Sequence, residues 1–361
     1  MVKRVQPHRL VFAFFLAITL SSWARCETPP APKLSAEETR QAFLKIIDRP
    51  HVDLAPKVEE QAADSDVLHF HFSFASEAGQ RVPGILLIKK ELMNDGVRHP
   101  AVVVLHGTGG KKEKELNILK KLASQGFVAV AIDGRFHGER GTYADYNAAI
   151  AKAFVDGNSH PLYYDTVWDI LRLIDYLQSR PDVDGKRIGL IGFSKGGIET
   201  YLAAAVDPRI AVAVPCIALQ SFRWGMENDG WHARIGTVRK GFDAAAKSAG
   251  VEMPGAEFVR VFYDHLLPGI YDPFDGPAMV RLIAPRPLLG ISGDRDPNNP
   301  LPGIRLCEQS AKAAYEKAGA PEKFELLLQQ DTGHSVKPEA EAVAIKWFNR
   351  WLGNESRSGR Q

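Results

Sequence analysis

Short apolar runs alternate with longer amphipathic stretches along most of this chain. From residue 100 onward the apolar runs predict six strands, at residues 100–105, 127–132, 187–191, 210–215, 286–292 and 324–328. Amphipathic stretches of helical period separate these runs, and strands that alternate with helices form a parallel sheet covered on both faces. We therefore expect an α/β fold with a doubly wound, mostly parallel sheet.

Two further strands and a helix are predicted before residue 100. Residues 68–74 alternate as Leu-His-Phe-His-Phe-Ser-Phe and residues 82–88 are mainly apolar, so we expect an antiparallel lead-in to the sheet. Residues 36–47 have a helical pattern. His69 and His71 share one face of the first strand, where such a pair can bind zinc, but no third ligand stands near them in the sequence. An exposed polar face is the preferred interpretation, and no metal site is expected.

The amphipathic stretch at residues 163–178 divides its side chains between two faces. Trp168, Leu171 and Leu177 are expected to point inward. Its carboxylates are expected on the polar face, as surface or capping groups. These carboxylates belong to Asp165, Asp169 and Asp175.

A long insertion separates the fourth and fifth of the six strands. It covers about residues 219–280 and is rich in aromatic residues. Insertions at this point of such a sheet lie above the edge that binds ligands, so we expect a helical cap. Most of its aromatic side chains should form the core of the cap itself. Trp224 and Trp231, which stand beside Gly225 and Gly230, are the candidates for the substrate pocket.

The first 26 residues have the organisation of a secretory signal peptide. Basic residues precede the apolar run at 10–20, which is too short to span a bilayer, and a cleavage site is expected near 24–26. An uncleaved anchor is the alternative. We expect a secreted or periplasmic protein with no other contact with a membrane. Its segments would be a linker and N-terminal helical segment at 27–65, the α/β domain with its cap insertion at 66–354 and a polar tail at 355–361.

Composition narrows the class of protein. A chain of 361 residues with 45% hydrophobic residues can bury one large core. Loss of the first 26 residues removes four basic residues and no acid, so the formal charge falls from +2 to −2. A near-neutral chain without a basic stripe excludes nucleic acid as a partner. Cys216 and Cys307 would remain after cleavage, either as buried thiols or as a disulfide.

Ser194 is the candidate nucleophile of this chain. It lies in Gly-Phe-Ser-Lys-Gly-Gly at residues 192–197, directly between a predicted strand and a predicted helix. In this setting G-x-S-x-G forms a nucleophile elbow, a turn so tight that only glycine fits beside the serine. The turn holds the serine hydroxyl where a substrate can reach it. A glycine-rich turn with an incidental serine is the alternative.

A second glycine-rich segment follows the strand at 100–105. It reads His106-Gly107-Thr108-Gly109-Gly110 and stands where such folds build half of an oxyanion hole. Two backbone N–H groups are needed to hold the negative oxygen of a tetrahedral intermediate. We expect them from Thr108 and from Lys195, the residue after the nucleophile. His106 and Gly109 are further candidates for lining the substrate pocket.

An acid and a base follow at the ends of the last two strands. His334 is the candidate general base, because an imidazole must take the proton of a serine hydroxyl for it to attack at neutral pH. A carboxylate must orient that imidazole. Asp296 is the first choice for it and Asp294 the second, since both follow the strand at 286–292.

These residues together resemble an α/β-hydrolase of the dienelactone hydrolase and prolyl-oligopeptidase-like kind. The resemblance extends from about residue 100 to residue 352, and the triad members stand in the order serine, aspartate, histidine that is typical of this superfamily. Residues 131–140 are similar to the loop that follows the next strand in such enzymes. That loop is interpreted as structural, with Arg135 and His137 at the mouth of the pocket as the alternative.

The sequence thus predicts an exported serine hydrolase that cleaves carboxylic esters through an acyl-enzyme intermediate, without a cofactor or a metal. The substrate would be a small-molecule or polymer-linked ester. A serine peptidase of the prolyl-oligopeptidase-like kind uses the same triad and is the first alternative. A non-catalytic binding protein on the same fold is the second. The sequence does not indicate an oligomeric state.

Overall fold

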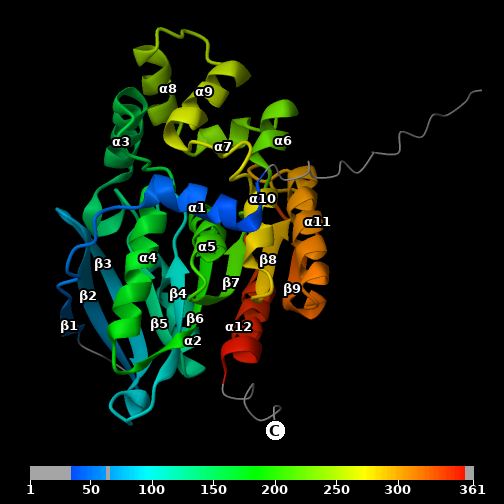
Figure 1. Ribbon diagram of the computed structural model, residues 1–361. Coiled ribbons are helices and arrows are strands. Elements are labelled where there is room, and N and C mark those ends of the chain that lie inside the picture. Colours follow the sequence, from blue (N-terminus) through cyan, green and yellow to red (C-terminus); the bar gives the residue numbers. More distant parts are fainter. Residues whose placement is uncertain (1–33, 62–65, 354–361) are drawn as a thin grey trace, which may run out of the picture.

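A single mixed sheet of nine strands organises the part of the chain that the computed structural model describes, residues 34–61 and 66–353. Its order is β1-β2-β3-β5-β4-β6-β7-β8-β9, and the pairs from β5 through β9 are all parallel (Figure 1). The strands are β1 (Lys57–Gln61), β2 (Val67–Glu77), β3 (Gln80–Lys89), β4 (His99–Leu105), β5 (Val128–Ile132), β6 (Val183–Phe193), β7 (Ile210–Cys216), β8 (Leu288–Gly293) and β9 (Phe324–Gln329). All six strands predicted for the parallel part are confirmed.

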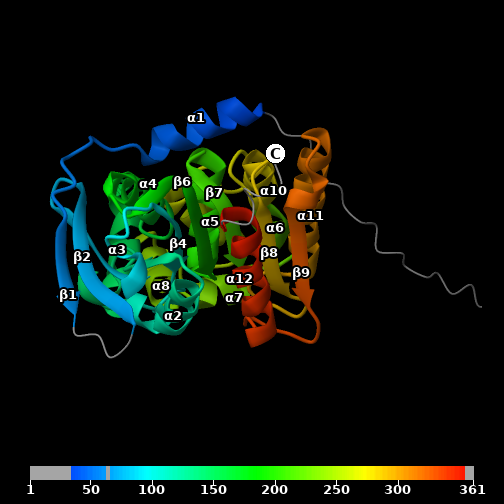
Figure 2. The ribbon, with the colours of Figure 1, turned by 90° about the horizontal axis from the view of Figure 1, so that it is seen from below.

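Helices cover both faces of this sheet, as expected for parallel strands whose side chains are apolar on both sides. Figure 2 shows α1, α4 and α11 along one face and α2 and α12 along the other. The helices are α1 (Ala36–Ile47), α2 (Leu116–Ser124), α3 (Tyr143–Asp156), α4 (Tyr164–Ser179), α5 (Lys195–Val206), α6 (Phe222–Glu227), α7 (His232–Gly236), α8 (Arg239–Ser248), α9 (Ala256–Leu266), α10 (Gly276–Val280), α11 (Leu301–Lys317) and α12 (Pro338–Leu352). The predicted α/β architecture is therefore confirmed.

The antiparallel lead-in contains one strand more than the sequence predicts. β2 and β3 pair antiparallel, as expected, and β3 then pairs antiparallel with β5. The additional strand is β1, which pairs with β2 inside the segment expected to be a linker and a helix. All five of its residues are exposed, so it has no apolar alternation that could reveal it.

Two carboxylates of α4 are buried rather than exposed, which corrects the prediction for this helix. Asp169 has no exposed surface and accepts hydrogen bonds from Arg135 and Arg140 at 2.7 to 2.9 Å. These bonds outweigh the burial that would raise the pKa of Asp169, and they hold that pKa well below its usual value. Asp165 is buried too and pairs with Arg49. The helix therefore ties the loop after β5 to the rest of the fold.

Helices α3 and α6 to α9 gather beyond one end of the sheet (Figure 1). The aromatic residues of α8 and α9 pack against each other and against α3, with ring centroids of Phe242 and Phe262 5.1 Å apart. Phe242, Phe258 and Phe262 are all buried, so they form the interior of this helical layer. Because α6 follows β7 directly, the layer stands at the carboxyl ends of the parallel strands.

Helix α1 begins at a capping box and lies across α4 and α5. The Ser35 hydroxyl accepts from the Glu38 N–H, and the Glu38 carboxylate accepts from the Ser35 N–H. Phe43 and Ile47 are fully buried on its inner face. The predicted signal segment at 1–26 and the tail at 355–361 lie outside the described residues. No helix in residues 34–61 or 66–353 is both long and apolar enough to cross a membrane.

Candidate active site

Ser194 occupies the turn between β6 and α5 with a strained backbone. Its φ is 54° and its ψ is −113°, a conformation that L-residues with a side chain seldom adopt. The Ser194 N–H donates to the Cys216 carbonyl at 2.9 Å, and the Ser194 carbonyl accepts from the Ile198 N–H at 3.0 Å. These two bonds hold the turn in place, so the side chain stands at the carboxyl end of the sheet.

The glycines of the elbow are required by close backbone contacts. A Cβ on Gly192 would lie 2.2 Å from the Gly196 carbonyl oxygen, and a Cβ on Gly196 would lie 2.3 Å from the Leu105 carbonyl oxygen. Because the nearby atoms belong to the backbone, a change of side-chain conformation could not relieve either contact. The structure therefore explains the G-x-S-x-G spacing by the approach of β4, β6 and α5 to one another.

Three predicted site residues form a continuous series of hydrogen bonds. The Ser194 hydroxyl lies 2.8 Å from His334 Nε2, and His334 Nδ1 lies 2.8 and 2.9 Å from the two carboxylate oxygens of Asp296. Since Nδ1 faces a carboxylate, it carries the proton and leaves Nε2 as the acceptor for the serine hydroxyl. This arrangement can deprotonate Ser194.

Asp296 is held by several donors besides the histidine. It accepts from the Asn298 N–H at 2.8 Å and from Asn299 Nδ2 at 2.7 Å, and it is 3% exposed. Burial alone would raise the pKa of Asp296, but the hydrogen bonds from His334 and from the asparagines bring that pKa below its usual value. Asp294, the second choice, instead accepts from the Thr332 N–H and contacts no histidine nitrogen among the described residues.

The loop after β4 contains backbone N–H groups that have no protein acceptor, and the Thr108 N–H is one of them. The Gly109 N–H donates to His137 Nε2 at 3.1 Å, and the Gly110 N–H donates to the Gly107 carbonyl at 2.9 Å. Within the described residues neither the Thr108 N–H nor the Lys195 N–H has a protein acceptor. Both donors expected for an oxyanion hole are therefore without a protein acceptor.

Two buried histidines support this loop, and their bonds fix the proton on each ring. His106 Nδ1 donates to the Gly107 carbonyl while its Nε2 accepts from the Gly134 N–H. His137 Nδ1 donates to the Arg135 carbonyl while its Nε2 accepts from the Gly109 N–H. Burial and the nearby Lys195 ammonium lower the pKa of His106 to about 4. Both rings are thus neutral supports of the loop.

The side chain of Lys195 points into the protein, away from the candidate oxyanion hole. It is 1% exposed and pairs with Glu199, one turn along α5. Burial raises the pKa of Glu199 to about 7, and the Lys195 ammonium counteracts this rise only in part. Lys195 can therefore contribute its backbone N–H to the site but not its charge.

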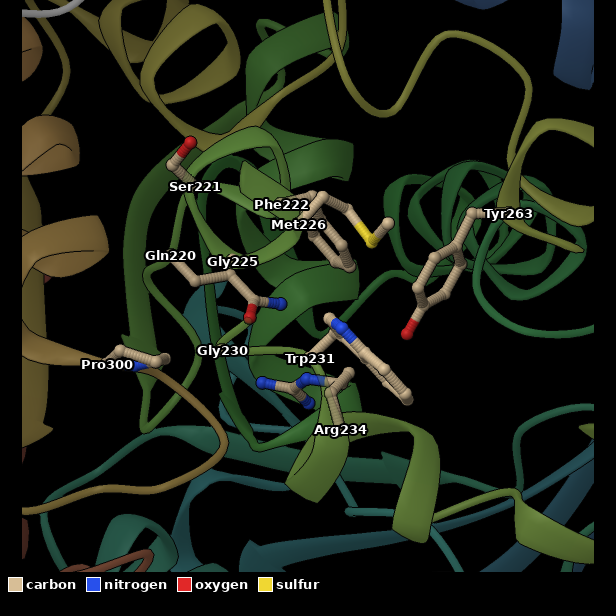
Figure 3. Close-up of a pocket in the computed structure, with 10 residues that line it drawn as sticks. All are labelled: Gln220, Ser221, Phe222, Gly225, Met226, Gly230, Trp231, Arg234, Tyr263 and Pro300. Carbon is tan, nitrogen blue, oxygen red and sulfur yellow. The ribbon is translucent and has the colours of Figure 1, made fainter. Parts of the chain in front are cut away.

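A pocket lies beside the triad acid, between α6, α7, α9 and the segment that follows Asp296. The cavity itself has a volume of about 10 Å³, which is room for about one water molecule. The ten lining residues, shown in Figure 3, are Gln220, Ser221, Phe222, Gly225, Met226, Gly230, Trp231, Arg234, Tyr263 and Pro300. Trp231, one of the predicted pocket residues, lines it, whereas Trp224 does not, and Gly109 lines a separate open hollow next to α3.

The sequence reasoning did not single out Asn299, Gln220 or Arg234. Asn299 is fully buried and connects Asp296 to Arg234, because its Nδ2 donates to Asp296 and its Oδ1 accepts from Arg234. The run Asp-Pro-Asn-Asn-Pro after β8 was the available signal for Asn299. Among the described residues, no three His, Cys, Asp or Glu side chains are grouped so that they could hold a metal ion. His71, one of the two histidines on β2, lies 2.8 Å from a carboxylate oxygen of Glu139.

Comparisons with known proteins find relatives that are named as hydrolases and esterases. Residues 87–219 match the Dienelactone hydrolase family. The chain is 26% identical over 266 residues to the putative hydrolase YtaP of Bacillus subtilis (strain 168), which covers 70% of this chain and 79% of the relative. It is 25% identical over 272 residues to the putative esterase YitV of the same organism, which covers 75% of this chain and 96% of the relative.

A solved structure shows the same fold at low sequence identity. Acetyl xylan esterase 1 from Thermoanaerobacterium sp. JW/SL YS485 superimposes with a TM-score of 0.65 at 20% identity, over 89% of this chain and 94% of that chain. The chain therefore has the α/β-hydrolase fold, and its residues 87–219 are similar to the Dienelactone hydrolase family.

Proposed function

We propose that this protein is an exported serine esterase in which Ser194, His334 and Asp296 form the catalytic triad. The series of hydrogen bonds from Ser194 through His334 to Asp296 is the observation that carries the proposal. The strained elbow supports it, because strain of this kind is retained where the position of a side chain matters for chemistry.

The first half of the reaction forms an acyl-enzyme. His334 Nε2 takes the proton of the Ser194 hydroxyl as its oxygen attacks the ester carbonyl carbon, and Asp296 stabilises the resulting imidazolium. The carbonyl oxygen becomes an oxyanion and accepts hydrogen bonds from the Thr108 and Lys195 N–H groups. His334 then gives its proton to the departing alkoxide, so that the alcohol leaves and the acyl group stays on Ser194.

The second half returns the enzyme to its starting state. A water molecule in the place of the alcohol gives its proton to His334 Nε2 and attacks the acyl carbon. The same two N–H groups hold the second oxyanion. Collapse of that intermediate breaks the bond to the Ser194 oxygen, which regains its proton from His334, and the carboxylic acid is released.

Helices α6 to α10 are proposed as the cap that selects the substrate, with Trp231 among the residues that line its pocket. Both small esters and esters carried on a polymer are candidate substrates. Acetylated xylan is one of them, because the structural relative is named an acetyl xylan esterase. Secretion or export to the periplasm rests on the signal-like sequence at residues 1–26 alone.

The proposal is tested with a panel of esters and amides on the protein that lacks residues 1–26. We expect hydrolysis of p-nitrophenyl acetate and release of acetate from acetylated xylan, with little cleavage of peptide p-nitroanilides. Ser194→Ala should lower kcat by about 10⁴-fold to 10⁶-fold and leave the circular dichroism spectrum unchanged. Faster cleavage of the amides than of the esters would favour a peptidase instead.

A further inference from the structure

The carboxylate of Asp296 is held by the side chain of Asn299 as well as by His334. Asn299 has no exposed surface, and its Nδ2 donates to Asp296 at 2.7 Å and to the Ile217 carbonyl at 2.8 Å. Both hydrogens of the amide are therefore in use. They join the triad acid to the backbone just beyond the end of β7, which fixes the place of the carboxylate at this end of the sheet.

Arg234 determines which way round the Asn299 amide lies. Its guanidinium donates to Asn299 Oδ1 and, at 3.1 Å, to the Asn298 carbonyl. A guanidinium has only donors, so it requires an oxygen at this position, and the NH₂ group of the amide must then face Asp296 and Ile217. A reversed amide would set its oxygen against the Asp296 carboxylate and the Ile217 carbonyl, which are both acceptors, and would turn its NH₂ group toward the guanidinium.

Arg234 belongs to the cap and not to the sheet. It lies on α7, and Figure 3 shows its side chain extending toward the segment of Pro300, which directly follows the two asparagines. The side chain is 5% exposed, and its partners in the described part of the chain are uncharged groups of Asn298, Asn299 and Tyr163. A buried guanidinium with neutral partners gains no ion pair in return for its loss of water. Its bonds therefore orient polar groups beside the triad acid.

We propose that Arg234 is a positioning residue of the triad. It orients Asn299, and Asn299 holds the carboxylate of Asp296 against His334 Nδ1. The triad acid therefore has its full set of donors only while α7 lies against the loop after β8. In this way the cap completes the catalytic machinery in addition to selecting the substrate. This inference rests on the proposed esterase function.

Loss of the guanidinium should slow the chemical step and leave substrate binding intact. Without it the Asn299 amide can turn its oxygen toward Asp296, which repels the carboxylate and loosens its bond to His334. For Arg234→Met we expect kcat with p-nitrophenyl acetate to fall by about 10-fold to 100-fold and KM to change by less than about twofold. Arg234→Lys keeps a donor for Asn299 Oδ1 and should recover most of kcat. If Arg234→Met does not fold, Arg234→Gln replaces it with the same expected fall, because a glutamine is two bonds shorter and does not reach Asn299 Oδ1.

Arg223→Met is the matched control for damage to the cap. Arg223 is also an arginine of the cap, and it donates to the Tyr271 carbonyl at 2.8 Å and pairs with Asp272 at 2.8 Å. Both partners lie within the cap, so this variant disturbs the cap without removing a bond to the triad loop. We expect its kcat to stay within about twofold of that of the unmodified protein. A fall equal to that in Arg234→Met would overturn the assignment.

A double variant tests whether Arg234 acts through Asn299. If it does, Arg234→Met combined with Asn299→Ala should have the kcat of Asn299→Ala alone, because the residue that transmits the effect is already gone. Losses that multiply in the double variant would contradict the proposed connection.

Proton NMR tests the same inference without any turnover. The proton on His334 Nδ1 is shared with a carboxylate and should give a signal far downfield, which His334→Gln identifies by its loss. We expect this signal to be sharp in the unmodified protein and in Arg223→Met. It should be broadened or lost in Arg234→Met, because a carboxylate that is less firmly held lets the proton exchange with water. An unchanged signal in Arg234→Met, or no signal in the unmodified protein, would contradict the proposal.

The outcomes separate this inference from the proposed function. An unchanged kcat in Arg234→Met, in a protein that hydrolyses esters and loses activity in Ser194→Ala, would overturn the inference and uphold the esterase. Absence of hydrolysis for every ester would overturn the esterase, and the NMR comparison would still decide whether Arg234 positions Asp296. A loss confined to KM would place Arg234 in substrate binding and contradict its role as a positioning residue.

Discussion

Replacing Asp296 with asparagine should disable the enzyme by reversing the proton on His334. Both carboxylate oxygens of Asp296 already accept hydrogen bonds, one from the Asn298 N–H and one from Asn299 Nδ2, and both lie within 2.9 Å of His334 Nδ1. An asparagine has one oxygen and one NH₂ group. If its oxygen stays with the loop donors, its NH₂ faces Nδ1, and the imidazole must then carry its proton on Nε2.

A ring nitrogen that already carries a proton cannot accept another from the Ser194 hydroxyl, so the general base is lost. Loss of the triad carboxylate in this way costs about 10⁴-fold in kcat, which is about 5 kcal/mol of transition-state stabilisation. Asp294→Asn is the matched control, because the carboxylate of Asp294 accepts only from the loop, at the Thr332 N–H, and an amide oxygen can replace it there.

Initial rates with p-nitrophenyl acetate measure both variants. We expect kcat to fall by about four orders of magnitude for Asp296→Asn and by less than about threefold for Asp294→Asn, with cooperative thermal unfolding retained in both. Equal losses in the two variants, or a larger loss in Asp294→Asn, would refute the assignment of the acid.

Further predictions concern the groups that support the loop and the elbow. The folded state keeps His106 neutral until about pH 4, whereas the unfolded state binds a proton near pH 6.5, so the free energy of unfolding should fall by up to about 3 kcal/mol as the pH drops through this window. Urea unfolding at pH 7.5 and at pH 4.5 should show a smaller fall for His106→Gln than for the unmodified protein. An identical fall in the two proteins would contradict this prediction. Lys195→Met leaves the buried Glu199 carboxyl without the ammonium that lowers its pKa, so at a pH well above 7, where the carboxyl must be charged, the free energy of unfolding should fall by about 3 to 5 kcal/mol. Lys195→Met/Glu199→Leu should restore most of this loss in the same unfolding assay. A double variant less stable than the single one would argue against an unpaired charge. His137→Phe removes the acceptor of the Gly109 N–H and should lower kcat by about 10-fold to 100-fold with little change in KM. His137→Gln should retain part of the activity that His137→Phe loses. An effect confined to KM would assign His137 to substrate binding.

The parallel sheet and the elbow were predictable because their signals are local. Each buried strand is a continuous apolar run, and the glycines around Ser194 are adjacent in the sequence to the residue that needs them. The order of serine, aspartate and histidine at successive strand ends then favoured the triad, since carboxyl ends of parallel strands share one edge of the sheet. His334 and Asp296 lie 38 residues apart and still meet at this edge.

Other features depend on contacts between distant segments and leave no local signal. β1 is entirely exposed, so its pairing with β2 is not visible in its own residues. Asp169 has the spacing of a residue on a polar helix face, and only the folded chain brings Arg135 and Arg140 to it.

The most direct test of the account is the site of covalent labelling by an alkyl fluorophosphonate, read by mass spectrometry. The reagent reports a serine that an adjacent base activates and that an oxyanion hole faces. The account predicts one equivalent of label on the active protein, located at Ser194 in the tryptic peptide that spans residues 188–195, and none on Ser194→Ala. Full ester hydrolysis by protein that remains unlabelled, or a label on any other residue, would contradict the central claim that Ser194 is the nucleophile.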